Sequence, residues 1–346
     1  MKTTSRLALF LALATSAFAA EVAKTAYTTP VGYTTVGGFQ VGYSAASGFF
    51  SESLHPGMNV IGLSLHHSTI VSGTIASLGK DFAELTGLPV DAKGNYKLAL
   101  VQGTTYILEI TSGQKAGVIQ EITRWQDLRL TLSDDIATAG VKPGDHFTLR
   151  KAATLNSVFD PRFTTLLKGE NPDTADNILI PQGSSFGDFR RCFILTLPEG
   201  NFWMDAATYQ PVGDLPLVYP DGLIVQCKGT TGVPMTFSGE VKSGPTRSVI
   251  KPGLNLVASP FPIGSSLQDL GLGNDLLKND DLMQADKVWI PSGILGGLFT
   301  TYYLTPENQW ICASDGSLVT EKIPVGSAFL IERQGPQALF TLGDGK

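Results

Sequence analysis

Histidine is scarce in this chain, and its placement restricts the catalytic chemistry that the sequence supports. All four histidines lie before residue 150: His55, His66, His67 and His146. Residues 183–187 read Gly-Ser-Ser-Phe-Gly and match the nucleophile elbow of serine hydrolases. That motif needs a helix after it and a downstream histidine as base. Because residues 188–195 read as a strand and no histidine follows, we predict a Gly/Ser hairpin and no catalytic residue.

Cysteine is scarce as well, and the count is odd. The three cysteines are Cys192, Cys227 and Cys312. An oxidising compartment would permit a disulfide between Cys192 and Cys227. Three buried thiols are the alternative, and the spacing alone does not decide between the two.

Clusters of metal ligands are few, and we predict no bound metal and no cofactor. His66 and His67 are adjacent, so on a strand their side chains point to opposite faces and do not easily bind one metal. Asp173, Asp176 and Asn177 supply oxygen atoms of the kind that Ca²⁺ uses, but this stretch has no glycine pivot and no suitably spaced glutamate. A turn held by Asx hydrogen bonds is the alternative.

Facing carboxylates are also not apparent. The pairs Asp134–Asp135 and Asp280–Asp281 are neighbours in sequence, whereas glycosidase carboxylates face each other across a bond at roughly 5–10 Å. Solvated loops are the better interpretation of both pairs. The sequence also contains no phosphate-binding loop and no dinucleotide fingerprint. We therefore predict that the protein is not an enzyme.

Basic patches and long apolar runs are missing too. The formal net charge is −6 and charged residues make up 16%, which argues against nucleic acid and anionic membrane surfaces as partners.

The N-terminus has the pattern of a secretory signal. It combines the basic residues Lys2 and Arg6, the apolar residues 7–14 and Ala-Phe-Ala at 17–19. Its apolar run is shorter than the ~18 residues of a membrane span. We expect a mature chain from near Ala20 in the periplasm, at the cell surface or outside the cell, and not an integral membrane protein.

Glycine (38) and proline (20), by contrast, are abundant, and they separate short apolar runs in a way that favours a β protein. One series of motifs occurs twice: an apolar strand, Ile-Pro-x-Gly, a tryptophan strand, Pro-x-Gly and a last apolar strand. We predict that residues 178–241 and 288–343 have the same strand order. Trp203 and Trp310 should then occupy matching places, mainly as core residues.

A second pair of motifs indicates an insertion. Both copies read Pro-Gly-apolar-Asn before a buried strand, and we predict that Asn59 and Asn255 bond their local backbone at the turn exit. Gly57 precedes Gly253 by 196 residues, whereas Pro181 precedes Pro291 by only 110. The difference of 86 residues indicates a domain inserted in the first copy.

The predicted fold class is all-β, with two related sandwich-like modules, the first interrupted by a small β-barrel-like inserted domain. We assign residues 1–19 to the signal peptide, 20–65 and 161–245 to the first module, 66–160 to the insert and 246–346 to the second module. Within the insert, period-2 stretches between Gly-rich turns predict strands. Short helices are predicted at residues 82–88 and 153–159, and helical turns at 266–282.

Several motifs, taken in order, resemble those of an exported verrucomicrobial paralogue family. They are the secretory signal, Thr-Pro-Val-Gly-Tyr at 29–33, Gly-Val-Lys-Pro-Gly-Asp at 140–145, Tyr-Pro-Asp-Gly at 219–222 and Pro-Gly-Leu-Asn-Leu at 252–256. The members of that family have no established activity. Each repeat also resembles the Gly-x-Asn-Leu-Val, Trp and Pro-x-Gly β module of secreted bacterial proteins, which implies a non-catalytic accessory. Neither resemblance supplies catalytic residues.

These observations predict an exported, non-enzymatic structural or interaction protein of the cell envelope, surface or extracellular matrix. Its partners would be other envelope or surface components. The alternative is a carbohydrate-binding protein that uses exposed aromatic side chains, with Trp125, Tyr302 and Tyr303 as the candidate ligand-binding residues. A hydrolase is the third choice.

Overall fold

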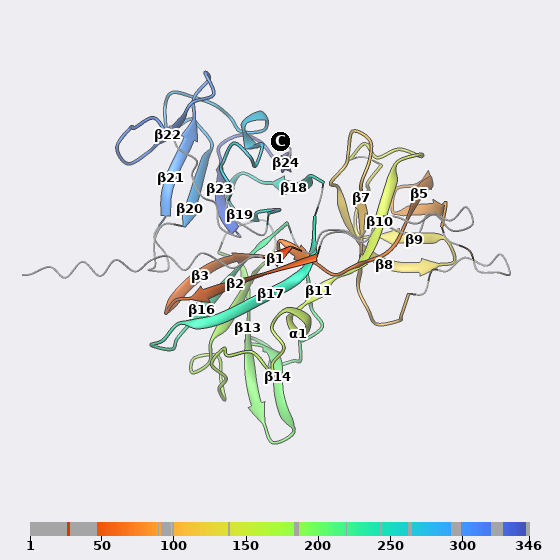
Figure 1. Cartoon of the computed structure of the whole chain (residues 1–346), viewed down its shortest axis with the longest axis vertical. Coiled ribbons are helices and arrows are strands. Elements are labelled where there is room, and N and C mark those ends of the chain that lie inside the picture. The colour runs from red at the N-terminus through yellow and green to blue at the C-terminus, as the bar shows by residue number, and fades with distance from the viewer. Residues whose placement is uncertain are drawn as a thin grey trace, which may run out of the picture.

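The computed structural model describes residues 26–27, 47–88, 90, 98, 100–137, 139–182, 187–218, 220–242, 244–261, 265–291, 299–319 and 328–343. Nearly all of the regular structure consists of strands, with one short α-helix and one 3₁₀ turn among the described residues. The predicted fold class is confirmed: sandwich-like β modules accompany a closed β-barrel (Figure 1).

The first module packs two sheets around one core. Its five-stranded sheet has the order β14 (Gly200–Asp205), β13 (Phe189–Leu197), β12 (Asn177–Pro181), β16 (Gly222–Cys227) and β3 (Gly57–Gly62). The second sheet contains β1 (Ala26–Tyr27), β2 (Ser47–Leu54), β17 (Val233–Val241) and β4 (Leu65–His66). Buried side chains from both sheets form a single cluster. Within it Phe50 of β2 stacks on Phe237 of β17 at 4.9 Å between ring centroids.

The second module repeats this arrangement with fewer strands. Its five-stranded sheet has the order β22 (Trp310–Cys312), β21 (Phe299–Leu304), β20 (Lys287–Pro291), β23 (Ala328–Arg333) and β19 (Gly253–Ala258). The pair β18 (Thr246–Ile250) and β24 (Ala338–Leu342) lies against it, and both sheets contribute to one core. Helical turns were predicted at residues 266–282, and the regular helical structure that forms there is a 3₁₀ turn, η1 (Leu272–Asn274).

The two five-stranded sheets pair in the same register. Ile194 of β13 lies opposite Trp203 of β14, and Leu304 of β21 lies opposite Trp310 of β22. Val212 donates its N–H to the Trp203 carbonyl at 2.9 Å, as Val319 does to the Trp310 carbonyl at 2.8 Å. Trp203 is almost fully buried, whereas Trp310 is half-buried.

Six strands between β4 and β11 close into a barrel with the order β10-β5-β6-β9-β8-β7. They are β5 (Thr69–Leu78), β6 (Phe82–Thr86), β7 (Tyr106–Ile110), β8 (Ile119–Gln126), β9 (Arg129–Leu132) and β10 (His146–Lys151). Inward apolar side chains fill the barrel, as expected for a barrel of this size. The barrel strands lie together at one side of the molecule (Figure 1).

After the barrel, the chain returns to the first module. β11 (Ala153–Thr154) pairs with β15 (Pro216–Leu217). The short helix α1 (Leu155–Val158) follows, and a capping box between Thr154 and Ser157 fixes its start. Leu155 and Phe159 are buried in the core of the first module. The helix predicted at 153–159 is therefore confirmed, although it is only one turn long.

The short helix predicted at residues 82–88 is wrong, because this stretch forms β6. Ala83 and Leu85 are buried, while the alternate residues Phe82 and Glu84 are only partly buried. That alternation has the period of a strand. β6 pairs with both β5 and β9, and barrel closure decides the conformation.

Candidate binding site

A cleft of about 480 Å³ lies beside β14 in the first module. Asn156 of α1, Arg190 of β13 and residues 201–203 of β14 line it, together with the connecting segment 211–215. Trp203 and Val212 are the buried members of this set, and the indole Nε1 of Trp203 donates to the Phe159 carbonyl at 2.8 Å. The base of the cleft is thereby fixed to the core of the first module.

Arg190, which lines the cleft, forms a partly buried ion pair with Asp205. Arg190 Nε donates to Asp205 Oδ2 at 2.7 Å, and the other carboxylate oxygen accepts the N–H groups of Ala207 and Thr208 at 2.8 and 3.1 Å. Burial acts to raise the pKa of Asp205, but the bonds from Arg190 and the two backbone groups outweigh it and lower that pKa. Asp205 therefore stays ionised at neutral pH and holds Arg190 in place.

Polar side chains line the cleft next to the apolar residues Pro211, Val212 and Leu215. Asn156 Nδ2 donates to Asp214 Oδ1 at 3.3 Å, and the Asn156 N–H donates to the Gly213 carbonyl at 2.8 Å. Asn201 Oδ1 accepts the Thr196 hydroxyl at 3.0 Å. Phe202 is 40% exposed. The cleft thus combines amide and guanidinium donors with a carboxylate acceptor, whereas Phe202 lies opposite Leu195 on the other face of the sheet.

The residues that line the cleft were not recognisable as a site from the sequence. Arg190, Asn201 and Phe202 lie in two strands, and Asn156 and Asp214 come from segments that are separate in the sequence. A difference between the two repeats was the one indication of them that the sequence offered. The pairing register places Thr300 where the first module has Arg190, since each lies opposite an isoleucine of the neighbouring strand.

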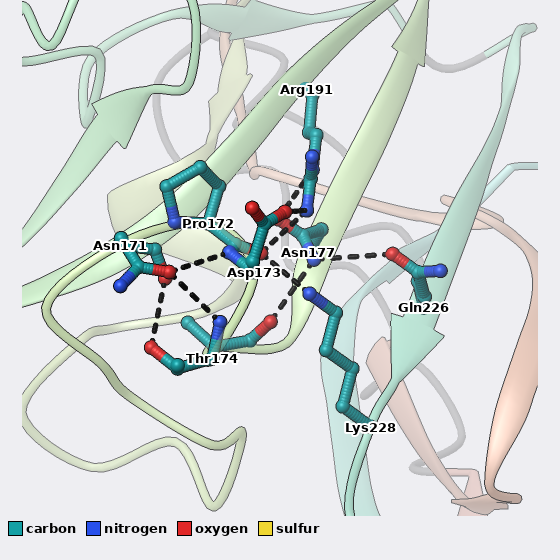
Figure 2. A network of polar contacts seen from close by, with 9 residues as sticks. Asn171, Pro172, Asp173, Thr174, Asn177, Arg191, Gln226 and Lys228 are labelled. Carbon is teal, nitrogen blue, oxygen red and sulfur yellow. Dashed lines mark hydrogen bonds and ion pairs between the residues drawn. The ribbon is translucent and has the colours of Figure 1, made fainter.

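The loop for which calcium and an Asx turn were the alternatives contains a dense polar network (Figure 2). Arg191 Nε donates to Asn177 Oδ1 at 2.9 Å, and its NH2 group donates to Asp173 Oδ1 at 3.0 Å. The Pro172 carbonyl accepts both the Arg191 NH2 group at 2.5 Å and Lys228 Nζ at 2.6 Å. Two cationic side chains therefore occupy the oxygen atoms that a Ca²⁺ ion would need.

Asn171 holds the same loop as an Asx turn. Its Oδ1 accepts the N–H groups of Asp173 and Thr174 at 2.9 and 3.1 Å. Burial, together with the charge of Arg191, lowers the pKa of Lys228. These contacts favour the structural alternative over calcium. Within the described ranges, no group of three or more His, Cys, Asp or Glu side chains has a metal-binding arrangement.

Asp176 is a structural carboxylate with a counterpart in the second module. It accepts the N–H groups of Leu167 at 2.8 Å and Lys228 at 2.7 Å. Asp286 likewise accepts those of Leu277 at 2.8 Å and Gln334 at 2.7 Å. Asp286 has an additional ion pair with Arg333. Both aspartates are buried and join a loop to the end of a central strand.

The three aromatic side chains predicted to bind a ligand are half-buried and do not come together at one place. Trp125 lies on the barrel strand β8 and makes an edge contact with Tyr106 at 5.8 Å. Tyr302 and Tyr303 lie on β21 of the second module. Tyr302 packs against the core of that module, and burial raises its pKa.

The other residues considered for catalysis lie apart from one another. Residues 183–186 of the elbow-like motif lie outside the described residues. His66 is buried and His67 half-buried at the start of the barrel segment. Asp134, Asp280 and Asp281 are exposed. None of these side chains lines the cleft beside β14.

All three cysteines are buried free thiols. Cys192 lies on β13 and Cys227 on β16, and β12 lies between these two strands. Two strand spacings amount to roughly 9–10 Å, which exceeds the Cα separation of about 7 Å that a disulfide tolerates. Burial raises the pKa of each of these two thiols to about 12. Both thiols are therefore protonated and unreactive near neutral pH.

A buried charge cluster joins the barrel to the rest of the chain. Glu109 of β7 contacts Arg150 of β10 at 3.2 Å and Lys242, which follows β17, at 2.5 Å. Lys242 Nζ also donates to the Thr246 hydroxyl at 2.7 Å. The three charged side chains are at most 9% exposed. The cluster thus connects the barrel with the segment that leads into the second module.

Comparison with known proteins assigns no relative to this chain. No protein-family model, no curated protein and no solved structure matches it. In the described segments, no helix has the length and apolar character needed to cross a membrane.

Proposed function

We propose that this chain is an exported, non-enzymatic structural or interaction protein of the cell envelope, the cell surface or the extracellular matrix. The main support is the use of its buried polar groups. Asp176 and Asp286 each bond two backbone N–H groups at matching places in the two modules. These carboxylates stabilise loops, and such use leaves them unsuited to proton transfer.

The proposed location depends on the secretory signal at residues 1–19 and on the resemblance to an exported verrucomicrobial family. Fractionation of the source cells tests it. We expect the protein in the periplasmic, surface or medium fraction, with an N-terminus near Ala20. A functional protein found in the cytoplasm with Met1 retained would contradict the proposal.

The non-enzymatic role has a separate test. Purified protein should show no turnover of glycoside, ester or peptide substrates, and the Ser185→Ala variant should behave as the wild type does. Turnover that disappears in Ser185→Ala would make the protein a serine hydrolase and would reject the proposed role.

Carbohydrate binding is the second candidate, and the cleft beside β14 favours it. The cleft brings several polar side chains together in one concave space, as small-ligand sites do. The three aromatic side chains chosen from the sequence are instead distributed over the barrel and the second module.

A further inference from the structure

We infer that the free edge of β14 binds an extended peptide strand of a partner protein through backbone hydrogen bonds at Asn201 and Trp203. The peptide that fits best has a cationic side chain that enters the cleft and apolar side chains on either side of it. This inference rests on the proposed role as an interaction protein and supplies its binding site and the class of its partner.

β14 is an edge strand, and its pairing with β13 decides which of its backbone groups face outwards. Ala206, which follows β14, donates its N–H to the Arg191 carbonyl of β13 at 2.8 Å. Hydrogen-bonded and non-hydrogen-bonded pairs alternate along an antiparallel ladder, so Asn201 and Trp203 fall in non-hydrogen-bonded pairs with β13. The backbone N–H and C=O groups of both residues therefore point away from β13, towards the edge of the sheet.

A neighbouring segment covers only part of this edge. The Trp203 carbonyl accepts the Val212 N–H at 2.9 Å. The chain then turns away from β14, since the Leu215 N–H donates to the Val212 carbonyl at 3.0 Å. Within the described ranges, no hydrogen-bond partner is observed for the backbone N–H and C=O of Asn201 or for the Trp203 N–H. The cleft lies beside these three groups.

The equivalent hairpin of the second module, between β21 and β22, does not form such an edge. It is shorter, because the Thr305 N–H already donates to the Gln309 carbonyl at 3.0 Å and a turn joins the two residues. The Asn308 N–H donates to the Thr305 carbonyl at 3.0 Å inside that turn. In the first module the two strands continue to the pair of Leu197 and Gly200. The added residues create the free edge, and the shared fold does not need them.

A free strand edge is a template for pairing with another chain, and proteins commonly protect it with a charged residue, a proline or a covering segment. Asn201 is neither charged nor a proline, and no strand among the described residues pairs with it on the outer side. A peptide that adds to an edge gains affinity from main-chain hydrogen bonds and specificity from alternate side chains. The fork between β14 and residues 211–215 offers it a concave space of about 480 Å³.

The two faces of β14 predict which side chains the peptide carries. The peptide residue opposite Asn201 directs its side chain to the same face as Asn201, which is the face of the cleft. The residues before and after it point to the other face of the sheet. There Phe202 and Leu197 are 40% and 41% exposed, so apolar side chains at these two flanking positions would cover them.

Charge distinguishes a cationic from an acidic central residue. Asp205 neutralises Arg190, so the exposed carboxylate of Asp214 is the excess charge of the lining. The whole chain is also negative, with a formal net charge of −6. A lysine or arginine is therefore attracted to the cleft and an acidic residue is repelled. The same charge disfavours a second copy of this chain at the edge, because like charges would meet across the interface.

Fluorescence polarisation with the full mature chain tests the inference. The probe is a fluorescein-labelled Thr-Val-Lys-Val-Thr peptide. A Thr-Val-Glu-Val-Thr peptide and the lysine peptide with a methyl group on its lysine backbone nitrogen are the comparisons. We expect the lysine peptide to bind and the glutamate peptide to bind at least about threefold more weakly. Methylation removes the central N–H donor and should weaken binding by about tenfold or more.

Variants of the chain locate the site. Asn201→Pro removes the outward N–H and should weaken binding of the lysine peptide by about tenfold or more. An edge strand tolerates a proline whose nitrogen faces outwards, and urea denaturation checks that the variant is folded. Asn201→Ala keeps the N–H and should weaken binding by at most about threefold. Asp214→Asn should remove the preference for lysine over glutamate. Phe163→Gln should leave the affinity unchanged, since Phe163 is 78% exposed and does not line the cleft.

Three results would overturn the inference: no binding of the lysine peptide, full affinity of the methylated peptide, or full affinity in a folded Asn201→Pro variant. The methylated peptide provides a test with the wild type even where Asn201→Pro unfolds the chain. A dimer that Asn201→Pro dissociates would assign the edge to a second copy and reject the inference. Binding of a neutral oligosaccharide in place of the peptide would also reject it, in favour of the second candidate function.

These outcomes are separate from those that test the proposed function. Absence of peptide binding in a correctly exported protein rejects the strand site alone. Cleavage of the bound peptide would reject the non-enzymatic role while leaving the site in place.

Discussion

At the scale of single residues, Glu109 is held between two cations that come from different parts of the chain. Arg150 lies in the barrel, while Lys242 follows β17. Removing one member of a buried ion pair leaves the other charge without compensation, which typically destabilises a protein by 3–5 kcal/mol.

We therefore expect Glu109→Gln to lower the free energy of unfolding by about 3–5 kcal/mol, measured by urea denaturation. The matched control is Glu84→Gln. Glu84 and Arg129 are 3.8 Å apart, and both side chains are about half-exposed. An exposed pair of this kind contributes at most about 1 kcal/mol. Equal losses in the two variants would contradict the structural role given to Glu109.

His66 should make the stability of the fold depend on acidity. Burial, together with the charges of Arg150, Lys242 and His67, lowers its pKa well below 6.5. The unfolded chain therefore binds a proton at a higher pH than the folded chain does. The stability from neutral His66 is fully present above about pH 6.5 and is lost as the pH falls below it.

The free energy of unfolding should accordingly decline between pH 7 and pH 5, by up to about 1.4 kcal/mol per pH unit from this one group. His66→Asn should reduce that slope in urea denaturation at a series of pH values. His146→Asn is the control, because His146 is exposed. A slope that is the same in wild type and His66→Asn would show that His66 titrates alike in both states.

Neither the charge cluster around Glu109 nor the burial of His66 was recognisable from the sequence. Glu109 and Lys242 are separated by the rest of the barrel and most of the first module. The residues of the cleft have the same character, since Asn156 and Asp214 are brought together by the pairing of β11 with β15. Local patterns carry no information on contacts between segments so far apart.

At the scale of elements, the Pro-Gly turns behave as the sequence predicts. Asn59 Nδ2 donates to the carbonyls of His55, Gly57 and Val225 at 2.8, 3.3 and 3.2 Å. Asn255 makes the equivalent bonds to Lys251, Gly253 and Ile331 at 2.7, 2.9 and 3.3 Å. The prediction that these asparagines bond the local backbone is confirmed. Each also reaches the neighbouring strand.

Asn59→Ala and Asn255→Ala should each cost about 1–3 kcal/mol, because each leaves partly buried backbone groups without a partner. The losses should be similar in urea denaturation, given the shared geometry. Asn201→Ala is the control. Asn201 has a single observed bond, to the exposed Thr196, so its loss should stay within about 0.5 kcal/mol. A large difference between Asn59→Ala and Asn255→Ala would contradict the equivalence of the two turns.

Sequence patterns predicted most strands correctly but failed where the apolar residues fit the helical period as well as the strand period. Residues 82–88 contain apolar groups that fit a helical turn as well as a strand, and pairing on both sides within the barrel decides for β6. Residues 266–282 contain several leucines, and four of them are buried in the second core: Leu267, Leu270, Leu272 and Leu276. Only one 3₁₀ turn forms there, since the glycines in this stretch disfavour a longer helix.

At the scale of the whole molecule, close contacts fix the modules and the barrel relative to one another. Leu256, Ala328 and Leu330 of the second module pack with Val60 and Ile224 of the first. The barrel is joined to β18 through Arg247, whose side chain donates to the carbonyls of Ala116 and Gln114 at 2.9 Å. The sequence predicted separate β units, but it gave no indication of these contacts.

Gly222 is a point of close approach between the two sheets. A Cβ atom at this position would lie 2.7 Å from Leu256 Cγ and 3.0 Å from Ala328 Cβ. The backbone next to it joins the modules directly, since the Ala258 N–H donates to the Pro220 carbonyl at 2.9 Å. Only glycine permits this approach without a shift of one sheet.

We therefore expect Gly222→Ala to destabilise the protein by about 1–3 kcal/mol through overpacking. Gly244→Ala is the matched control, because a Cβ atom at Gly244 would meet nothing within 4 Å. That variant should be neutral or stabilising by up to about 1 kcal/mol. Urea denaturation measures both changes, and small-angle X-ray scattering shows whether the modules separate. If Gly222→Ala is as harmless as Gly244→Ala and the scattering curve is unchanged, the sheets do not depend on close approach at this glycine. The modules would then be held mainly by the bonds of Arg247 and the Glu109 cluster, through the barrel.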